Sequence, residues 1–281
     1  MFNTTTGSVL FSRDPIVTLG GIVLPAGTFP APELFKLPAR PHQEILQLKK
    51  QKCVGILEYL ASGEVHSSMR VLTWLLKLEE RQTQATLSGM SAEKLVLPED
   101  LGLAGRIYGI IQYGGDFIYP TKVFRFFSSG KTSSLNLNHH WLCQLVRIQL
   151  QHFYEIKYWI PEKVLLKERK FPNIPDGVFD FDGLRFCIEV ELSPKLLSAQ
   201  ESILKTYCDM LCEVPDPGAW ANRVIFFTPF VDLMVERINE YARDEFKHLF
   251  FVQFLDPVVL SYKRGSYLLN DDLLKFLGSK D

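Results

Sequence analysis

The sequence lacks an uncharged apolar run of the about 18 residues that cross a membrane. Its start, MFNTTTGSVLFSRDP, also lacks the basic and then apolar pattern of a secretion signal. We therefore expect a cytoplasmic protein without membrane insertion. Cysteine is scarce as well, with five residues and no CxxC pair, so we expect reduced, buried thiols rather than disulfides or a zinc cluster. No phosphate-binding loop precedes Lys131-Thr132, which argues against nucleotide hydrolysis.

The net charge is small, −1 over 281 residues, but it is unevenly distributed. Residues 120–170 carry nine basic residues against three acidic ones, whereas residues 171–281 carry 11 against 18. The basic stretch is either a solvated surface or a strip that binds phosphates. Its candidate DNA contacts are Lys122, Arg125, Lys131, Arg147, Lys167, Arg169 and Lys170.

The chain length predicts about two domains, which follow an irregular, proline-rich arm over residues 1–40. Apolar spacing predicts helices over residues 41–62 and 67–78, the second capped by Ser67 or Ser68. A third short helix is expected from Ser91, and then a strand over residues 106–120 that breaks at Gly114-Gly115. Three helices followed by a β-ribbon is the order of a winged helix, so we expect a winged-helix-like domain over residues 41–130.

The second domain, over residues 135–281, is expected to be α/β (α+β) with a mixed central sheet. A helix over residues 137–153 precedes two short strands, and two further strands meet at Asp182-Gly183, a strong hairpin signal. The remaining segments are a helix over 195–214, a buried strand over 223–228, a helix over 232–247 and a buried strand over 249–255. The two short strands are residues 154–161 and 163–169. Counted as one strand before the hairpin, they give the predicted order α-β-β-β-α-β-α-β.

Three acidic residues of the hairpin form the candidate catalytic group. Glu189 and Glu191 are two residues apart on one strand and so share a face, and the turn places Asp176 opposite Glu189. Convergent carboxylates repel one another unless a proton or a cation neutralises them. Mg²⁺ or Mn²⁺ takes such oxygen ligands and would suit phosphodiester hydrolysis. The alternative is an exposed sheet face with scattered acids.

These residues also resemble a known motif. Pro175-Asp176, twelve further residues and then Glu189-x-Glu191 resemble the PD-(D/E)xK nuclease superfamily, with Glu191 in place of the usual lysine. Lys195 is the expected substitute, and Lys167 or Lys170 are alternatives. Together with YGIIQYG at Tyr108–Gly114, the His139-His140 helix, IEVELSPK and Lys205-x-Tyr207, residues 45–255 resemble the MobC-type relaxase and replication-relaxation family of plasmid mobilisation proteins.

The resemblance implies a bacterial enzyme that binds plasmid DNA at the transfer origin and nicks one strand to start conjugative transfer. A relaxosome accessory or coupling protein would be its partner. Asp176, Glu189 and Glu191 would be the catalytic acids and metal ligands, and Lys195 would supply the missing positive charge. Because Glu191 replaces a lysine, a non-catalytic DNA-binding relaxosome accessory or replication regulator on a degenerate nuclease fold is the alternative, and a scaffold that binds no nucleic acid is a third possibility.

Two further residues are possible accessories to the site. Tyr207 is either a nucleophile that forms a phosphotyrosyl link or a tyrosine at the edge of the core. Lys205 is either a phosphate contact or a solvated helix residue. His139 and His140 are adjacent on one helix and are expected to have structural roles rather than to ligate a metal.

Overall fold

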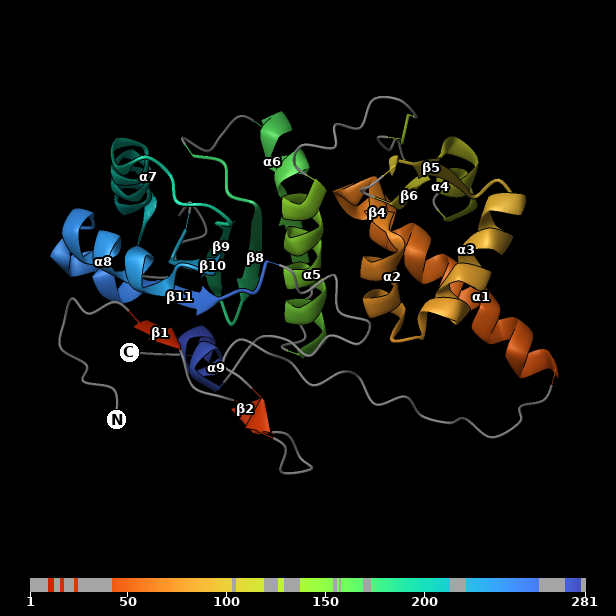
Figure 1. Ribbon diagram of the computed structural model, residues 1–281, viewed down its shortest axis with the longest axis horizontal. Helices are drawn as coiled ribbons and strands as arrows, with labels where there is room; N and C mark the ends of the chain where they lie inside the picture. Colours follow the sequence, from red (N-terminus) through yellow and green to blue (C-terminus); the bar gives the residue numbers. More distant parts are fainter. Residues whose placement is uncertain are drawn as a thin grey trace. The chain divides into compact units, whose positions relative to one another are not determined.

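The computed structural model describes residues 10–12, 16–17, 23–24, 42–102, 105–118, 126–128, 137–153, 156, 158–168, 173–212, 221–257 and 271–278. The described chain has a mixed α/β structure (Figure 1). It divides into two compact units, one formed by Pro32–Ile148 and the other by Met1–Ala31 with Gln149–Asp281. None of the helices in these ranges is long and apolar enough to cross a membrane.

The unit of Pro32–Ile148 combines helices with a three-stranded antiparallel sheet of order β4-β6-β5. Its elements in chain order are α1 (His42–Tyr59), the π-helical turn η1 (Leu60–Glu64), β4 (His66–Ser68), α2 (Met69–Leu76), α3 (Glu80–Ala92), β5 (Val96–Asp100), β6 (Arg106–Ile110), α4 (Gln112–Ile118) and the first turns of α5 (Leu137–Phe153). Strand β6 is central and pairs with both of its neighbours.

The first two predicted helices are confirmed. The residues predicted to end the first helix and to cap the second are confirmed as well. The helical run that starts at His42 stops at Gly63, whose φ of 118° is readily adopted only by glycine. Ser68 caps α2, because its hydroxyl accepts a hydrogen bond from the backbone N–H of Val71 at 3.3 Å.

The third predicted helix was misplaced. Helix α3 ends at Ala92, close to where a helix was expected to begin, and the chain continues as strand β5. The buried stripe of α3 is half polar, since Thr83 and Thr86 accompany Leu87 and Met90. Apolar spacing alone therefore underestimates this helix.

The glycine pair at positions 114 and 115 lies in helix α4, not in a broken strand. The preceding strand, β6, ends at Ile110. Gly114 allows close packing there, because a Cβ at this position would lie 2.0 Å from the backbone oxygen of Leu95.

The other unit is built on a six-stranded mixed sheet of order β1-β11-β10-β9-β8-β7. Its elements are β1 (Leu10–Ser12), β2 (Ile16–Val17), β3 (Val23–Leu24), the end of α5, β7 (Tyr158–Pro161), α6 (Glu162–Glu168), β8 (Gly177–Phe181), β9 (Leu184–Val190), α7 (Leu197–Met210), β10 (Arg223–Thr228), α8 (Val231–Tyr241), the 3₁₀ helix η4 (Asp244–Leu249), β11 (Phe250–Phe254) and α9 (Asp271–Gly278). Strands β1, β11, β10 and β9 are parallel, and β8 and β7 complete the sheet in antiparallel pairing. The mixed central sheet is thus confirmed.

The hairpin is confirmed at the predicted turn, where Asp182 and Gly183 both have positive φ angles, 48° and 81°. Helix α5 and the buried strand β10 are also confirmed. Residues 163–169, in contrast, were predicted as a strand, and Glu162–Glu168 form helix α6. A short apolar run does not distinguish a strand from a helix, and this one follows an acidic residue that favours a helix start.

Both faces of the large sheet are covered (Figure 1). On one face, Cys187, Val224, Phe226 and Val252 share a buried core with residues of α7 and α8. On the other face, Phe186 and Phe251 contact the ring of Phe276 from α9, at 6.2 and 5.2 Å between ring centroids. Because side chains alternate along β9, Glu189 and Glu191 lie on the same face as Cys187, under α7.

Candidate functional site

The hairpin brings Asp176 next to Glu189. The register pairs Gly177 with Ile188, and one further step places Asp176 opposite Glu189. The backbone N–H of Asp176 donates to the oxygen of Ile188 at 3.0 Å, and the N–H of Val190 donates to Oδ2 of Asp176 at 2.7 Å. The register predicted from the turn is therefore confirmed.

The two glutamates are buried rather than spread over an exposed sheet face. Glu189 is 7% exposed and Glu191 is 6% exposed. Burying a carboxylate is costly unless it is paired, protonated or bound to a metal. The interpretation of these acids as scattered surface charges is thus excluded, and their environment needs a chemical explanation.

Glu189 is held by two donors and has an unusual proton affinity. Its Oε1 accepts hydrogen bonds from the hydroxyl of Tyr207 and, at 3.0 Å, from Nδ2 of Asn173. Burial and then the nearby charge of Asp176 raise the pKa of Glu189 to about 8, although the Tyr207 hydroxyl and the charge of Lys195 oppose the shift. The folded environment thus favours the protonated form of Glu189 over what an exposed glutamate would show.

Tyr207 is a core residue, so the second of its two interpretations is confirmed and its interpretation as a nucleophile is wrong. Its side chain is fully buried, and its ring packs edge-on against Phe226. Burial and then the charge of Glu189 raise the pKa of Tyr207 well above its ordinary value. A phenol that is both protonated and inaccessible does not attack a phosphate, so its role lies in the hydrogen bond to Glu189.

Lys195 brings a positive charge into the cluster. Its Nζ lies 2.5 Å from Oε2 of Glu191, and the two side chains are 37% and 7% exposed. Burial acts to lower the pKa of Lys195, but the hydrogen bond to Glu191 and the charges of Glu189, Glu191 and Asp176 outweigh it, so the pKa is raised. Lys195 therefore stays an ammonium beside the acids.

The donor set suits a hard divalent cation at Asp176 and Glu189. The hydrogen bonds to the Glu189 side chain described above end on Oε1, and carboxylate oxygens are the ligands that Mg²⁺ and Mn²⁺ prefer. Burial first, and the charge of Asp176 second, raise the pKa of Glu189, and a bound cation would oppose both effects. Glu191 is bound instead to Lys195, and the three carboxylates do not bring one oxygen each within 4.8 Å of the others.

The remaining predicted site residues are dispersed. Lys205 lies on the outer side of α7, where it pairs with Glu201 at 2.6 Å. Arg147 is buried in an ion pair with Glu64 at 2.7 Å, so it does not belong to a surface strip that contacts DNA. Lys167 lies in α6. The other members of the predicted strip lie outside the described residues: Lys122, Arg125, Lys131, Arg169 and Lys170. The alternative lysine at position 170 lies there too.

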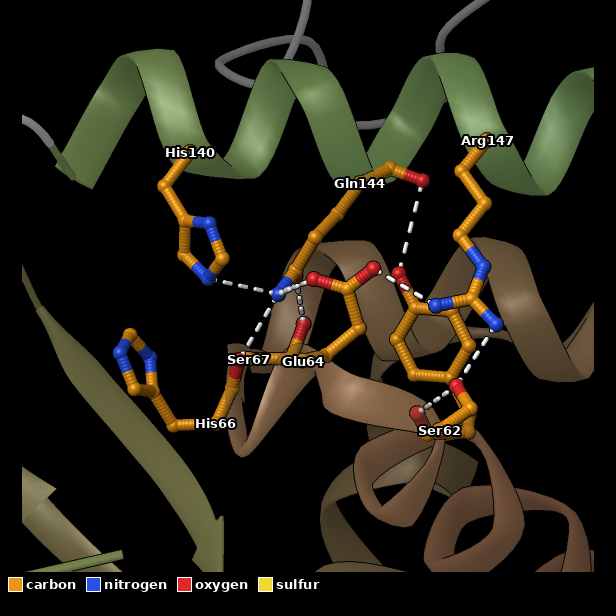
Figure 2. A network of polar contacts seen from close by, with 8 residues as sticks. Ser62, Glu64, His66, Ser67, His140, Gln144 and Arg147 are labelled. Atoms are coloured by element: carbon orange, nitrogen blue, oxygen red, sulfur yellow. Dashed lines mark hydrogen bonds and ion pairs between the residues drawn. The ribbon is translucent and has the colours of Figure 1, made fainter. Parts of the chain in front are cut away.

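The buried Arg147 belongs to a polar network in the unit of Pro32–Ile148 that the sequence did not reveal. Figure 2 shows His140, Gln144 and Arg147 projecting from one side of α5 toward Glu64 and its neighbours. Arg147 also donates to the hydroxyl of Ser62 at 2.7 Å, and Nε2 of Gln144 donates to Oε2 of Glu64 at 3.1 Å.

Further contacts complete the network. Nε2 of Gln144 also donates to the backbone oxygen of His66 at 2.8 Å and lies 2.9 Å from Nε2 of His140. The hydroxyl of Ser67 donates to Oε1 of Gln144 at 2.5 Å. The structural role expected for His140 is thus confirmed. The helical spacing of His140, Gln144 and Arg147 places them on one face of α5, but a solvent-exposed face has the same spacing, so the sequence did not distinguish a buried network from a surface.

The network explains the burial of Glu64 and Arg147, since each charge is paired and hydrogen-bonded. All of its members belong to one unit, so it fastens the first turns of α5 to β4 and η1. Of the five cysteines, which were expected to be buried, Cys53, Cys187 and Cys208 are buried and Cys143 and Cys212 are partly exposed. In comparisons with known proteins, the chain matches no protein-family model and no curated protein.

Proposed function

We propose that the protein is a metal-dependent DNA-nicking relaxase of plasmid mobilisation, with Asp176, Glu189, Glu191 and Lys195 as its catalytic group. The observation that carries the proposal is the pair of buried glutamates, Glu189 and Glu191, that lie with Asp176 around one lysine at the end of β9. Such perturbed groups cluster at functional sites more often than in purely structural cores. The PD-(D/E)xK-like spacing of Asp176 and Glu189 on a mixed sheet supports the same conclusion.

Each residue has a distinct role in this proposal. Asp176 and Glu189 would hold Mg²⁺ or Mn²⁺, which when bound would polarise the scissile phosphate and activate a water. Lys195, held by Glu191, would stabilise the negative charge that develops on the phosphate oxygens. Glu191 would thus orient Lys195, which takes the place of the lysine that the motif carries at position 191.

The unit of Pro32–Ile148 supports DNA binding by a winged helix. Its three helices α1, α2 and α3 are followed by the antiparallel ribbon of β5 and β6, as expected for that fold, and the additional strand β4 pairs with β6. Helix α3 exposes Arg81, Gln82, Ala85 and Ser88, and arginine and glutamine are residues that read base edges in the major groove. The partners would be plasmid DNA at the transfer origin and a relaxosome accessory or coupling protein.

The test is a nicking assay. Supercoiled plasmid that carries the cognate origin is incubated with the protein and Mg²⁺ or Mn²⁺, and open circles are expected. Asp176→Asn and Glu189→Gln should abolish nicking and retain DNA binding. Asp180→Asn is the matched control, because Asp180 lies on β8, four residues after Asp176, but is exposed and paired with Arg185. Nicking by Asp176→Asn and Glu189→Gln at the wild-type rate would refute the assignment.

A second function is favoured by one observation, the presence of Glu191 at the lysine position of the motif. It is a non-catalytic DNA-binding relaxosome accessory or replication regulator. This function predicts retarded origin DNA without strand breaks under any divalent ion, and unchanged binding after Glu191→Ala. Affinity should then fall steeply with salt, because contacts to phosphates would supply it.

A further inference from the structure

We infer that Tyr207 and Asn173 are positioning residues that fix Oε1 of Glu189 and thereby present Oε2 to a divalent cation. This inference rests on the proposed function, which makes Glu189 a metal ligand. It assigns a role to the hydroxyl of a tyrosine that is buried too deeply to reach a substrate itself.

Both donors reach the same oxygen from different parts of the unit. Tyr207 extends from α7, and Asn173 lies in the segment that precedes β8. Within the described residues, the hydrogen bonds to the Glu189 side chain all end on Oε1. An unrestrained carboxylate rotates easily about its last torsion and exchanges its two oxygens. Two donors on one oxygen remove that freedom and leave the other oxygen with a defined direction.

The tyrosine itself is immobile, which a positioning residue requires. Its ring meets Phe226 of β10 edge-on, with 6.3 Å between centroids and an interplanar angle of 87°. It also belongs to the buried core that α7 shares with the sheet. The rigid core thus determines where the hydroxyl lies, and the hydroxyl determines the orientation of Glu189.

The experiment measures Mn²⁺ binding by the full chain in the absence of DNA, by calorimetric titration and by electron paramagnetic resonance of free Mn²⁺. Mutation of a residue that hydrogen-bonds to a metal ligand typically changes the metal affinity about 10- to 100-fold. We expect Tyr207→Phe to weaken Mn²⁺ binding by such a factor, and Asn173→Ala to weaken it in the same direction. Tyr59→Phe is the matched control, because Tyr59 is also buried but its hydroxyl donates to the backbone oxygen of Gln144.

Two further measurements distinguish a positioning role of Tyr207 from a purely structural one. In a Glu189→Gln background, Tyr207→Phe should cause no additional loss of Mn²⁺ affinity, since the residue acts through the carboxylate. In nicking assays, Tyr207→Phe should lower kcat and leave KM for DNA unchanged. Asn173→Ala provides the same test on an incompletely buried side chain if Tyr207→Phe folds poorly.

The outcomes are distinguishable. Wild-type Mn²⁺ affinity in both Tyr207→Phe and Asn173→Ala, with Mn²⁺ still bound by the unaltered protein, would overturn the positioning role and leave the proposed function intact. Failure of the unaltered protein to bind Mn²⁺ or Mg²⁺ at all would overturn both. A loss that persists undiminished in the Glu189→Gln background would also overturn the inference.

Discussion

The ammonium of Lys195 lies 2.5 Å from Oε2 of Glu191, four residues earlier in the chain. In the nuclease-like site that we propose, Lys195 would compensate for the glutamate at position 191, because Glu191 binds it. One positive charge remains in the cluster, although it reaches the site from the segment before α7 rather than from strand β9.

Lys195→Gln should reduce nicking at least tenfold, because the neutral amide cannot stabilise charge on the phosphate. The same change should lower the free energy of unfolding by about 1 to 2 kcal/mol, between the values for surface and buried ion pairs. Gel assays of open circles and urea denaturation measure the two effects. Lys275→Gln is the control and should nick at the wild-type rate, since Lys275 is an exposed residue of α9 that pairs with Asp272.

The free energy of unfolding should depend on pH through Glu189. Its folded pKa of about 8 lies above its ordinary value of 4.5, so the folded state binds the proton more tightly than the unfolded state. The stability contributed by this proton is fully present below pH 4.5 and is lost as the pH rises to 8. The slope for one proton is at most about 1.4 kcal/mol per pH unit.

Glu189→Gln removes this dependence. With divalent ions chelated, the variant should gain stability relative to the wild type as the pH rises from 5 to 8, and the difference should level off above pH 8. Urea denaturation at several pH values measures it. If the free energies of unfolding of the variant and the wild type differ by the same amount at pH 5 and at pH 8, the prediction is wrong.

Arg147→Met should destabilise the unit of Pro32–Ile148 by about 3 to 5 kcal/mol, because it leaves Glu64 buried without its counter-charge. Changing Glu64 to Gln in the same protein should recover a large part of the loss. Asp180→Asn, which breaks the more exposed pair with Arg185, should cost less than about 1 kcal/mol. If Arg147→Met and Asp180→Asn have equal denaturation midpoints, the buried pair does not stabilise the unit as argued.

Two helical glycines should respond oppositely to alanine. Gly114→Ala should destabilise the protein, since the added Cβ would lie 2.0 Å from the oxygen of Leu95 and the backbone must shift. Gly89→Ala should stabilise it by up to about 1 kcal/mol, because no atom lies within 4 Å of that Cβ and alanine favours the helix. Thermal unfolding of the two variants, measured side by side, tests the local packing.

The sequence predicted what local chemistry determines. The turn at Asp182-Gly183 defined the hairpin, and from it the opposition of Asp176 and Glu189. Ser68 likewise marked the start of α2. In each case, the signal lies within a few residues of the feature that it determines.

Features that depend on distant partners were not predictable. The bond from Tyr207 to Glu189 joins residues 18 apart through the packing of α7 on the sheet. Arg147 looked like a surface charge because Glu64, its partner, lies 83 residues earlier. Helix α3 was not predicted in its place because threonines occupy part of its buried side. The pairing of strand β1 with β11 was not predicted either, because β11 lies near the opposite end of the chain.

The ion pair of Glu64 and Arg147 also bears on how this protein is made. During synthesis, Glu64 emerges from the ribosome well before the arginine that neutralises it, so the unit of Pro32–Ile148 cannot reach its final state until α5 has been translated. For the same reason, a truncated polypeptide that ends before α5 would retain a carboxylate without its counterion in its interior. Protein chemists who isolate this half of the molecule should therefore end it no earlier than Ile148.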